Sequence, residues 1–161
     1  MKIASLFTGA GGLDLGFERA GFDVVWANEY DSTIWETFEH NFPKTKLDKR
    51  SIVDVPASEI PDVDGIIGGP PCQSWSEAGA GRGINDKRGQ LFYDYIRLLK
   101  EKQPKFFLAE NVSGILHPKH KEAFSNSLIM FENASLCFGC KIPETFSARK
   151  NFGCFSFNKR I

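Results

Sequence analysis

Short apolar runs alternate with helix-like patterns along the first part of the chain. Residues 2–7 and 22–27 are rich in apolar side chains and predict two buried strands. Between them, residues 13–20 repeat apolar side chains at helical spacing, and Gly21 ends this predicted helix. A strand, a glycine turn, a helix and a second strand make a βαβ unit, which predicts a parallel sheet.

The alternation continues as far as residue 134. We predict further helices over residues 31–41, 91–102 and 118–132 and further buried strands over residues 62–67 and 106–109. Residues 74–90 are rich in glycine. That composition suits a segment that moves over a ligand, and it suits an ordinary surface loop equally well.

The last part of the chain breaks this pattern. Residues 135–161 mix Phe, Cys, Ser, Asn and Lys without a clear period, so we expect them to pack poorly. Poor packing there would leave an edge of the sheet uncovered and an apolar face exposed, and both favour self-association. We therefore divide the chain into residues 1–134 and a divergent tail, residues 135–161.

Composition sets limits on the class of protein. The chain has 161 residues, of which 42% are hydrophobic and 25% charged, values that suit one globular domain. Neither a signal peptide nor a membrane-spanning run is visible, which predicts a cytoplasmic protein. The net charge is zero, but residues 1–44 are mostly acidic and residues 141–160 mostly basic. A basic end suits phosphate contact or a solvated tail.

Four cysteines are present, and a cytoplasmic protein rarely joins them in disulfides. Cys137 and Cys140 have the spacing of half a zinc site, and Cys154 or a histidine could join them. A structural zinc site usually shows two such pairs, and only one is present. We therefore predict no metal.

Cys72 stands at an unusual turn, Gly68-Gly69-Pro70-Pro71-Cys72-Gln73-Ser74, directly after an apolar run. Glycine lets the backbone pass close to a neighbour, and proline fixes φ on the way out. A free cysteine is commonly a small buried apolar residue. The rigid turn and the polar exit favour instead a nucleophile at the end of a strand, where open α/β sheets hold ligands.

A second glycine turn follows the first predicted strand. Gly9, Gly11 and Gly12 lie in it, and Glu29 ends the next strand twenty positions after Gly9. Such a turn can serve helix packing alone, but a carboxylate at this spacing suits the two hydroxyls of a ribose. The glycines depart from the G-x-G-x-x-G spacing, so an adenosyl ligand without a pyrophosphate fits better than a dinucleotide.

Glu110 ends another predicted strand, just before Asn111 and Val112. Strand ends of a parallel sheet open onto one cleft, so Glu110 and Cys72 would face the same pocket. A strand-end carboxylate can also simply bind backbone amides. A thiolate beside a carboxyl group of raised pKa would supply a nucleophile and an acid.

Together these motifs resemble the cytosine-C5 DNA methyltransferases, especially those of bacterial restriction–modification systems. The motifs are Phe7-Thr8-Gly9-Ala10-Gly11-Gly12, Glu29, Gly69-Pro70-Pro71-Cys72-Gln73, Asp86-Lys87-Arg88-Gly89-Gln90-Leu91-Phe92 and Glu110-Asn111-Val112. The resemblance runs from about Ile3 to Ala134. It implies a Rossmann-like, mostly parallel sheet with helices on both faces, with residues 1–134 as the cofactor-binding and catalytic region.

The resemblance also implies a mechanism. A cytosine is flipped out of double-stranded DNA, the Cys72 thiolate attacks C6, and Glu110 holds N3. C5 then takes a methyl group from S-adenosylmethionine, a base removes the C5 proton, and the thiolate leaves.

Site residues follow from the same resemblance. Glu29 would hold the ribose, Tyr30 would stack on adenine, and the cofactor residues as a whole would be Phe7, Gly9, Gly11, Gly12, Glu29, Tyr30, Ser51, Ile52, Pro71 and Leu91. The residues implied to meet DNA are Gln73, Ser74, Ser76, Arg82, Arg88, Asn111 and Val112.

Two departures from the family matter. Ser51 stands where the family has an acid for the adenine amino group, so Asp48 or Asp54 would have to substitute and cofactor binding should be weak. After Ala134 nothing matches the Gln-x-Arg-x-Arg block, the target-recognition region or the final helix. The fold should therefore be incomplete at the C-terminus, as in a truncated, frame-shifted or split enzyme that needs a complementing chain.

Two other readings stay open. The chain could be an inactive remnant that only binds cofactor, or it could methylate RNA cytosine, as a related eukaryotic enzyme does with tRNA. Transfer of a labelled methyl group to DNA or RNA would separate these readings.

Overall fold

The computed structural model describes residues 1–71, 87–111, 118, 121–131, 133–134, 140–141 and 153–158. For residues 87–89, 123, 140–141 and 153–158 the description covers the backbone alone. The predicted residues Cys72, Gln73, Ser74, Ser76, Arg82 and Val112 lie outside these ranges.

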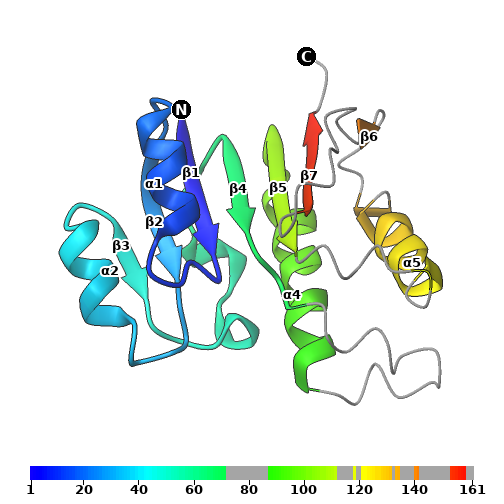
Figure 1. Ribbon diagram of the computed structural model, residues 1–161, viewed down its shortest axis with the longest axis horizontal. Coiled ribbons are helices and arrows are strands. Elements are labelled where there is room, and N and C mark those ends of the chain that lie inside the picture. The colour runs from blue at the N-terminus through cyan, green and yellow to red at the C-terminus, as the bar shows by residue number, and fades with distance from the viewer. Residues whose placement is uncertain are drawn as a thin grey trace.

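A single twisted sheet forms the centre of the described part (Figure 1). Its strands are β1 (Lys2–Leu6), β2 (Asp23–Asn28), β3 (Lys46–Asp48), β4 (Gly65–Gly68), β5 (Phe106–Asn111), β6 (Cys140–Lys141) and β7 (Gly153–Asn158). They lie in the order β3-β2-β1-β4-β5-β7-β6. The first five are parallel to one another, while β7 is antiparallel to both β5 and β6.

Helices lie on both faces of this sheet (Figure 1). The described helices are α1 (Gly12–Arg19), α2 (Trp35–Asn41), α4 (Lys87–Lys102) and α5 (Lys121–Phe131), with 3-10 turns η1 (Ile52–Asp54) and η2 (Ala57–Glu59). Helix α1 covers one face and α4 the other, as a doubly wound α/β sheet requires. The prediction of a mostly parallel, Rossmann-like sheet with helices on both faces is therefore confirmed.

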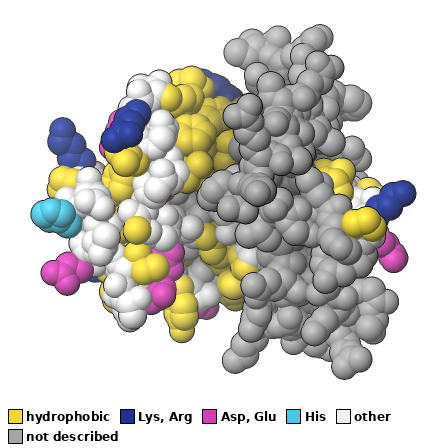
Figure 2. Space-filling view, in the orientation of Figure 1, with side chains coloured by type: hydrophobic (Ala, Val, Ile, Leu, Met, Phe, Trp, Pro, Cys, Tyr) yellow, Lys and Arg dark blue, Asp and Glu magenta, His cyan; other side chains and the backbone are white. Residues whose placement is uncertain are grey.

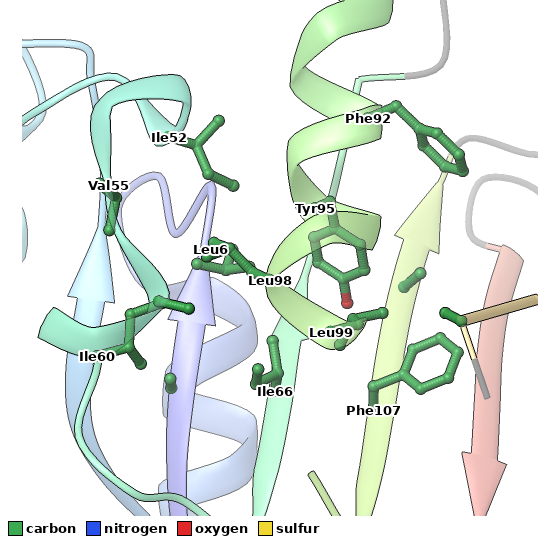
Figure 3. Packing of buried hydrophobic residues seen from close by; sticks show 14 of the residues in the cluster. Leu6, Ile52, Val55, Ile60, Ile66, Phe92, Tyr95, Leu98, Leu99 and Phe107 are labelled. Atoms are coloured by element: carbon green, nitrogen blue, oxygen red, sulfur yellow. The ribbon is translucent and has the colours of Figure 1, made fainter. Parts of the chain in front are cut away.

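Alternate residues of each strand supply the two cores. Leu6, Ile66 and Phe107 face α4 and pack with Tyr95 and Leu98 of that helix (Figure 3). Ile3 and Ile67 point to the opposite face and pack near Leu13 and Phe17 of α1. Because the central strands are buried on both sides, they read as continuous apolar runs. On the α1 and α2 face, charged side chains of both signs are scattered among apolar ones (Figure 2).

Two helix starts differ from the sequence-based expectation. Helix α4 begins at Lys87 rather than at residue 91, so Lys87–Gln90 belongs to the helix and not to the glycine-rich loop. Gly89 made this turn look like a loop, but packing of the rest of the helix outweighs one glycine. Helix α2 begins at Trp35, because Asp31 instead accepts hydrogen bonds from the backbone and hydroxyl of Thr33 in a preceding turn.

The prediction of an uncovered sheet edge is wrong. Strand β7 pairs with the whole of β5, from Phe106 opposite Asn158 to Asn111 opposite Gly153. The sequence carried a signal for this strand, since Phe155 and Phe157 alternate with Ser156. This alternation covers only three residues, and the residues on either side of it show no clear period.

Among the described residues, no helix is both long and apolar enough to cross a membrane.

Candidate cofactor and catalytic site

Four neighbouring parallel strands end at the same edge of the sheet, and the predicted motifs follow them. The glycine turn follows β1, Glu29 follows β2, the turn Gly69–Pro71 follows β4, and Glu110 lies near the end of β5. These strands stand in the order β2-β1-β4-β5. Residues from four distant stretches of sequence are thereby brought to one edge, which is where open α/β sheets bind ligands.

The turn after β1 has a backbone that suits close approach of a ligand. Phe7, Gly9 and Gly11 all have positive φ, at 55°, 55° and 86°. A Cβ on Gly9 would meet nothing within 4 Å, so the space beside it is open. A Cβ on Gly11 would collide with the ring of Phe42, so glycine is needed there to let α2 approach.

Glu29 is fixed across this turn by two backbone amides. Gly9 N donates to Glu29 Oε2 at 2.9 Å, and Asp31 N donates to Glu29 Oε1 at 2.8 Å. Trp35 Nε1 also donates to the Glu29 carbonyl oxygen at 2.8 Å. Each carboxylate oxygen keeps a further lone pair, so the group can still accept hydrogen bonds from a diol. The carboxylate is thus held ready beside the open space at Gly9.

The neighbouring predicted cofactor residues differ in exposure. The ring of Tyr30 is 72% exposed at this edge, while Ile52 is buried in the core on the α4 side. Ser51 is half-buried directly before η1. Pro71 and Leu91 are half-buried, and Leu91 packs against the core.

The structure separates the two acids that could replace the missing one at Ser51. Arg50 binds Asp48 through both side-chain oxygens, at 3.0 and 2.6 Å, and its hydrogen bond lowers the pKa of Asp48. Asp54 is exposed at the end of η1. Asp48 is already paired with Arg50, so of the two acids Asp54 is the one whose carboxylate is exposed and, among the described residues, unpaired.

Sequence reasoning missed Asn28, the buried last residue of β2. Its Nδ2 donates to the carbonyl oxygens of Asp48, at 3.1 Å, and Arg50, at 2.8 Å. This side chain therefore fixes the backbone just before Ser51. An asparagine at a strand end was visible in the sequence, but its partners lie 20 and 22 positions away.

A second missed residue is Asp14, which is fully buried beneath the glycine turn. Thr8 Oγ1 donates to Asp14 Oδ2 at 2.7 Å, while Asp14 Oδ1 and the hydroxyl of Ser5 lack a hydrogen-bond partner of good geometry. Burial raises the pKa of Asp14, and the hydrogen bond from Thr8 opposes that rise. The sequence did offer one sign of this role, because Asp14 is an acidic residue on the inner side of the helix predicted over residues 13–20.

The proposed catalytic side is built around Glu110. A Cβ on Gly69 would lie 3.0 Å from Glu110 Oε2, so the missing side chain at Gly69 makes room for this carboxyl group. Burial raises the pKa of Glu110. Next to it, Asn111 Nδ2 donates to the Pro70 carbonyl oxygen at 2.8 Å. The Glu110 carboxyl group therefore lies against the turn that leads to Cys72.

The structure describes few of the residues in the DNA-contact and metal predictions. Of the residues implied to meet DNA, the structure describes the side chain of Asn111, and the backbone alone of Arg88, which lies in α4. No group of three or more potential ligands gathers as a metal site within the described ranges. Cys137 and Cys154 have no described side chains, so the zinc alternative stays open.

The fold is that of the S-adenosylmethionine-dependent methyltransferases, and sequence comparison defines the family. The C-5 cytosine-specific DNA methylase family matches residues 1–150, so the chain belongs to this family. It is 57% identical to the type II methyltransferase M.NgoPII of Neisseria gonorrhoeae over 100% of its length. It is 60% identical to M.FnuDI of Fusobacterium nucleatum over 91% of its length.

Solved structures agree with this assignment. A prophage-encoded E. coli protein assigned to the DNA modification methyltransferases matches 99% of this chain with a TM-score of 0.74 and 31% identity. A variant of Spodoptera frugiperda DNMT2 matches 99% of the chain with a TM-score of 0.69 and 26% identity. The chain covers 47% and 50% of those two structures.

The chain spans less than half the length of the curated relatives it matches, 46% of M.NgoPII and 42% of M.FnuDI. The family match runs to residue 150, and the match to M.NgoPII covers the whole chain. The resemblance therefore extends beyond Ala134, where the sequence motifs alone placed its end. The division at residue 134 stays a prediction.

Proposed function

We propose that this chain carries the cofactor site and the nucleophile for methyl transfer from S-adenosylmethionine to C5 of cytosine in DNA. The observation that carries the proposal is the position of Glu110. Its carboxyl group, whose pKa burial raises, lies against the Gly69 turn. This turn follows β4, and the glycine turn that Glu29 spans follows the neighbouring strand β1. An acid and a cofactor-binding turn at the same edge of the sheet fit the chemistry of this family.

The residues present fit an adenosyl group. The space beside Gly9 is open, and the fixed carboxylate of Glu29 can accept hydrogen bonds from both ribose hydroxyls. Tyr30 exposes its ring at the same edge, where it can stack on a purine. When bound, S-adenosylmethionine supplies an electrophilic methyl group.

The chain's own groups would then act on the base. Cys72, as the thiolate, forms a bond to C6 of a flipped cytosine, and electron density moves toward C5 and N3. Glu110 in its protonated form donates a hydrogen bond at N3, which the raised pKa favours. After C5 has been methylated, a base takes the C5 proton and the Cys72–C6 bond breaks. The thiolate is regenerated.

We further propose that sequence-specific activity needs the part of the relatives that this chain does not span. Base edges are read by residues placed in a DNA groove, and the relatives are about twice as long as this chain. In the tests below, a separate complementing chain supplies that part.

The test is methyl transfer from labelled S-adenosylmethionine. The full chain would be assayed on DNA and on tRNA, alone and together with the C-terminal half of M.NgoPII. We expect label on DNA in the mixture and none with the Cys72→Ser variant. DNA carrying 5-fluorocytosine should trap wild-type Cys72 covalently, because fluorine cannot leave as a proton does. Label on tRNA alone would refute the DNA assignment, and an adduct with Cys72→Ser would refute the nucleophile.

A further inference from the structure

The segment Ser51–Ile52, at the proposed adenine end of the site, is held from α4 by one arginine. Arg97 Nη2 donates to the Ile52 carbonyl oxygen at 3.1 Å and to the Val55 carbonyl oxygen at 3.0 Å. Ile52 is the first residue of η1, and Val55 is its C-cap residue. One guanidinium nitrogen therefore binds both ends of the turn that carries Ile52.

A buried acid fixes the orientation of this guanidinium. Asp94 is 4% exposed, and its Oδ1 accepts a hydrogen bond from Arg97 Nε at 2.7 Å. Its Oδ2 accepts from Gln90 Nε2 at 3.0 Å, in the first turns of the same helix. Because Asp94 is engaged on both oxygens, Arg97 has one arrangement in which all of these bonds are made.

The other end of the same segment is held from β2. Asn28 Nδ2 donates to the Arg50 carbonyl oxygen at 2.8 Å, immediately before Ser51. Ser51 itself has an extended backbone, with φ −60° and ψ 141°, and lies between the two anchored carbonyls of Arg50 and Ile52. Its position relative to the edge of the sheet is thus set by Asn28 and Arg97. The side chain of Ile52 points toward α4, where it packs in the same core as Leu98 (Figure 3).

We propose that Arg97 is a positioning residue for the adenine end of S-adenosylmethionine. It acts through the backbone of Ile52 and Ser51, so it sets how closely this segment meets the adenine amino edge. This inference rests on the proposed function, since it requires that the cofactor bind at the edge formed by the glycine turn and Glu29. It adds a residue 45 positions from the segment that it places.

A matched control exists on the same helix. Lys102 Nζ donates to the Ile60 carbonyl oxygen at 2.9 Å and to Asp62 Oδ1 at 3.1 Å. This contact also joins α4 to a carbonyl just beyond a 3-10 turn, η2, but it lies away from Ser51. Loss of the Lys102 contact should lower stability without changing the cofactor site.

The experiment measures binding of S-adenosylhomocysteine and of its N6-methyl derivative by calorimetry. It uses the full chain as wild type, Arg97→Gln, Arg97→Lys and Lys102→Gln, with a urea unfolding curve for each. We expect Arg97→Gln to bind S-adenosylhomocysteine about tenfold more weakly, which corresponds to ~1.4 kcal/mol. Arg97→Gln should also lose preference for the unmethylated amino group. Arg97→Lys, which keeps the positive charge and its N–H donors on a single nitrogen, should be intermediate, and Lys102→Gln should bind like wild type.

Each outcome decides the inference. Equal affinities of wild type and Arg97→Gln would overturn it. So would a weaker affinity in Lys102→Gln, because affinity would then follow overall stability and not the Arg97 contact. Absence of any preference for the unmethylated ligand in wild type would overturn it too, since the segment would then not meet the adenine edge. If Arg97→Gln fails to fold, the same comparisons apply to Arg97→Lys. Wild type that binds neither ligand would refute the proposed function, and the positioning role with it.

Discussion

Asn111 Nδ2 donates to the Pro70 carbonyl oxygen at 2.8 Å and so joins the end of β5 to the turn after β4. The two residues are 41 positions apart in sequence. Sequence motifs placed Asn111 among the DNA contacts, but in the structure its side-chain amide binds the protein's own backbone. It ties the strand that carries Glu110 to the backbone that leads to Cys72.

Loss of this bond should therefore loosen the catalytic turn. In Asn111→Asp the carboxylate would face the Pro70 carbonyl oxygen without a proton to donate, which should cost about 1–3 kcal/mol of unfolding free energy. Urea unfolding would measure the cost, and trapping on 5-fluorocytosine DNA with the complementing chain would measure the placement of Cys72. We expect both the unfolding free energy and the trapping rate to fall.

Gln103→Glu is the matched control, because Gln103 Nε2 also donates to carbonyl oxygens, those of Lys100 and Ala134, far from the turn. It should lower stability and leave the trapping rate unchanged. A wild-type trapping rate in Asn111→Asp would contradict the positioning role.

Glu29 should dominate the affinity for the ribose. Replacement by alanine removes the acceptor that Gly9 and Asp31 hold in place, and we expect cofactor affinity to fall by about 1–3 kcal/mol. Calorimetry with S-adenosylhomocysteine measures this directly. Glu39→Ala, which removes a surface ion pair with Lys49, should bind as wild type does. An unchanged affinity in Glu29→Ala would show that the cofactor does not meet this carboxylate.

Local sequence chemistry predicted the strand ends and the two glycine turns well. Apolar runs followed by glycine or proline marked the ends of these strands, so Glu110 and Cys72 were predicted to face one pocket. That inference needed only strands that run parallel in one sheet, and not their order.

The positioning residues could not be predicted in the same way. Asn28 and Arg97 act on carbonyl oxygens that lie between 20 and 45 positions away. A carbonyl group is present at every residue, so sequence carries no sign of which one a distant side chain will reach. Strand β7 was missed for a related reason, since its pairing with β5 depends on a partner far along the chain.

The buried acid beneath the glycine turn predicts an unusual dependence of stability on pH. Burial raises the pKa of Asp14 in the folded chain above the value of about 3.9 that an unfolded chain has. The folded state therefore binds the Asp14 proton more tightly, and the stability due to this proton is present at low pH and lost as pH rises through the raised pKa.

Asp14→Asn keeps an acceptor for Thr8 and cannot ionise. The unfolding free energy of Asp14→Asn, relative to that of wild type, should increase as pH rises from about 4 toward neutrality. Urea unfolding of both proteins across this range measures the difference. Asp48→Asn should show the opposite sign and at lower pH, because the hydrogen bond from Arg50 lowers the pKa of Asp48 and its stabilising effect is lost as pH falls below about 4. A constant difference between wild type and Asp14→Asn would contradict the raised pKa.

Strand β7 makes residues beyond 134 necessary for pairing the outer side of β5. A chain that ends at Ala134 would leave β5 without its antiparallel partner, so the N–H and C=O groups from Phe106 to Asn111 that now pair with β7 would face solvent. Such an edge pairs readily with a second chain. We expect the 161-residue chain to sediment with a smaller mean mass than the shortened chain at equal concentration.

A point variant separates strand pairing from mere length. Ser156 lies opposite Leu108 in the middle of the β5–β7 pair, and proline at position 156 cannot donate a backbone hydrogen bond. Ser156→Pro should therefore associate like the shortened chain, whereas Ser156→Thr, which suits a strand, should behave like wild type. Sedimentation velocity over a range of concentrations distinguishes these cases. If the shortened chain and Ser156→Pro both stay monomeric, β7 does not protect the edge of β5.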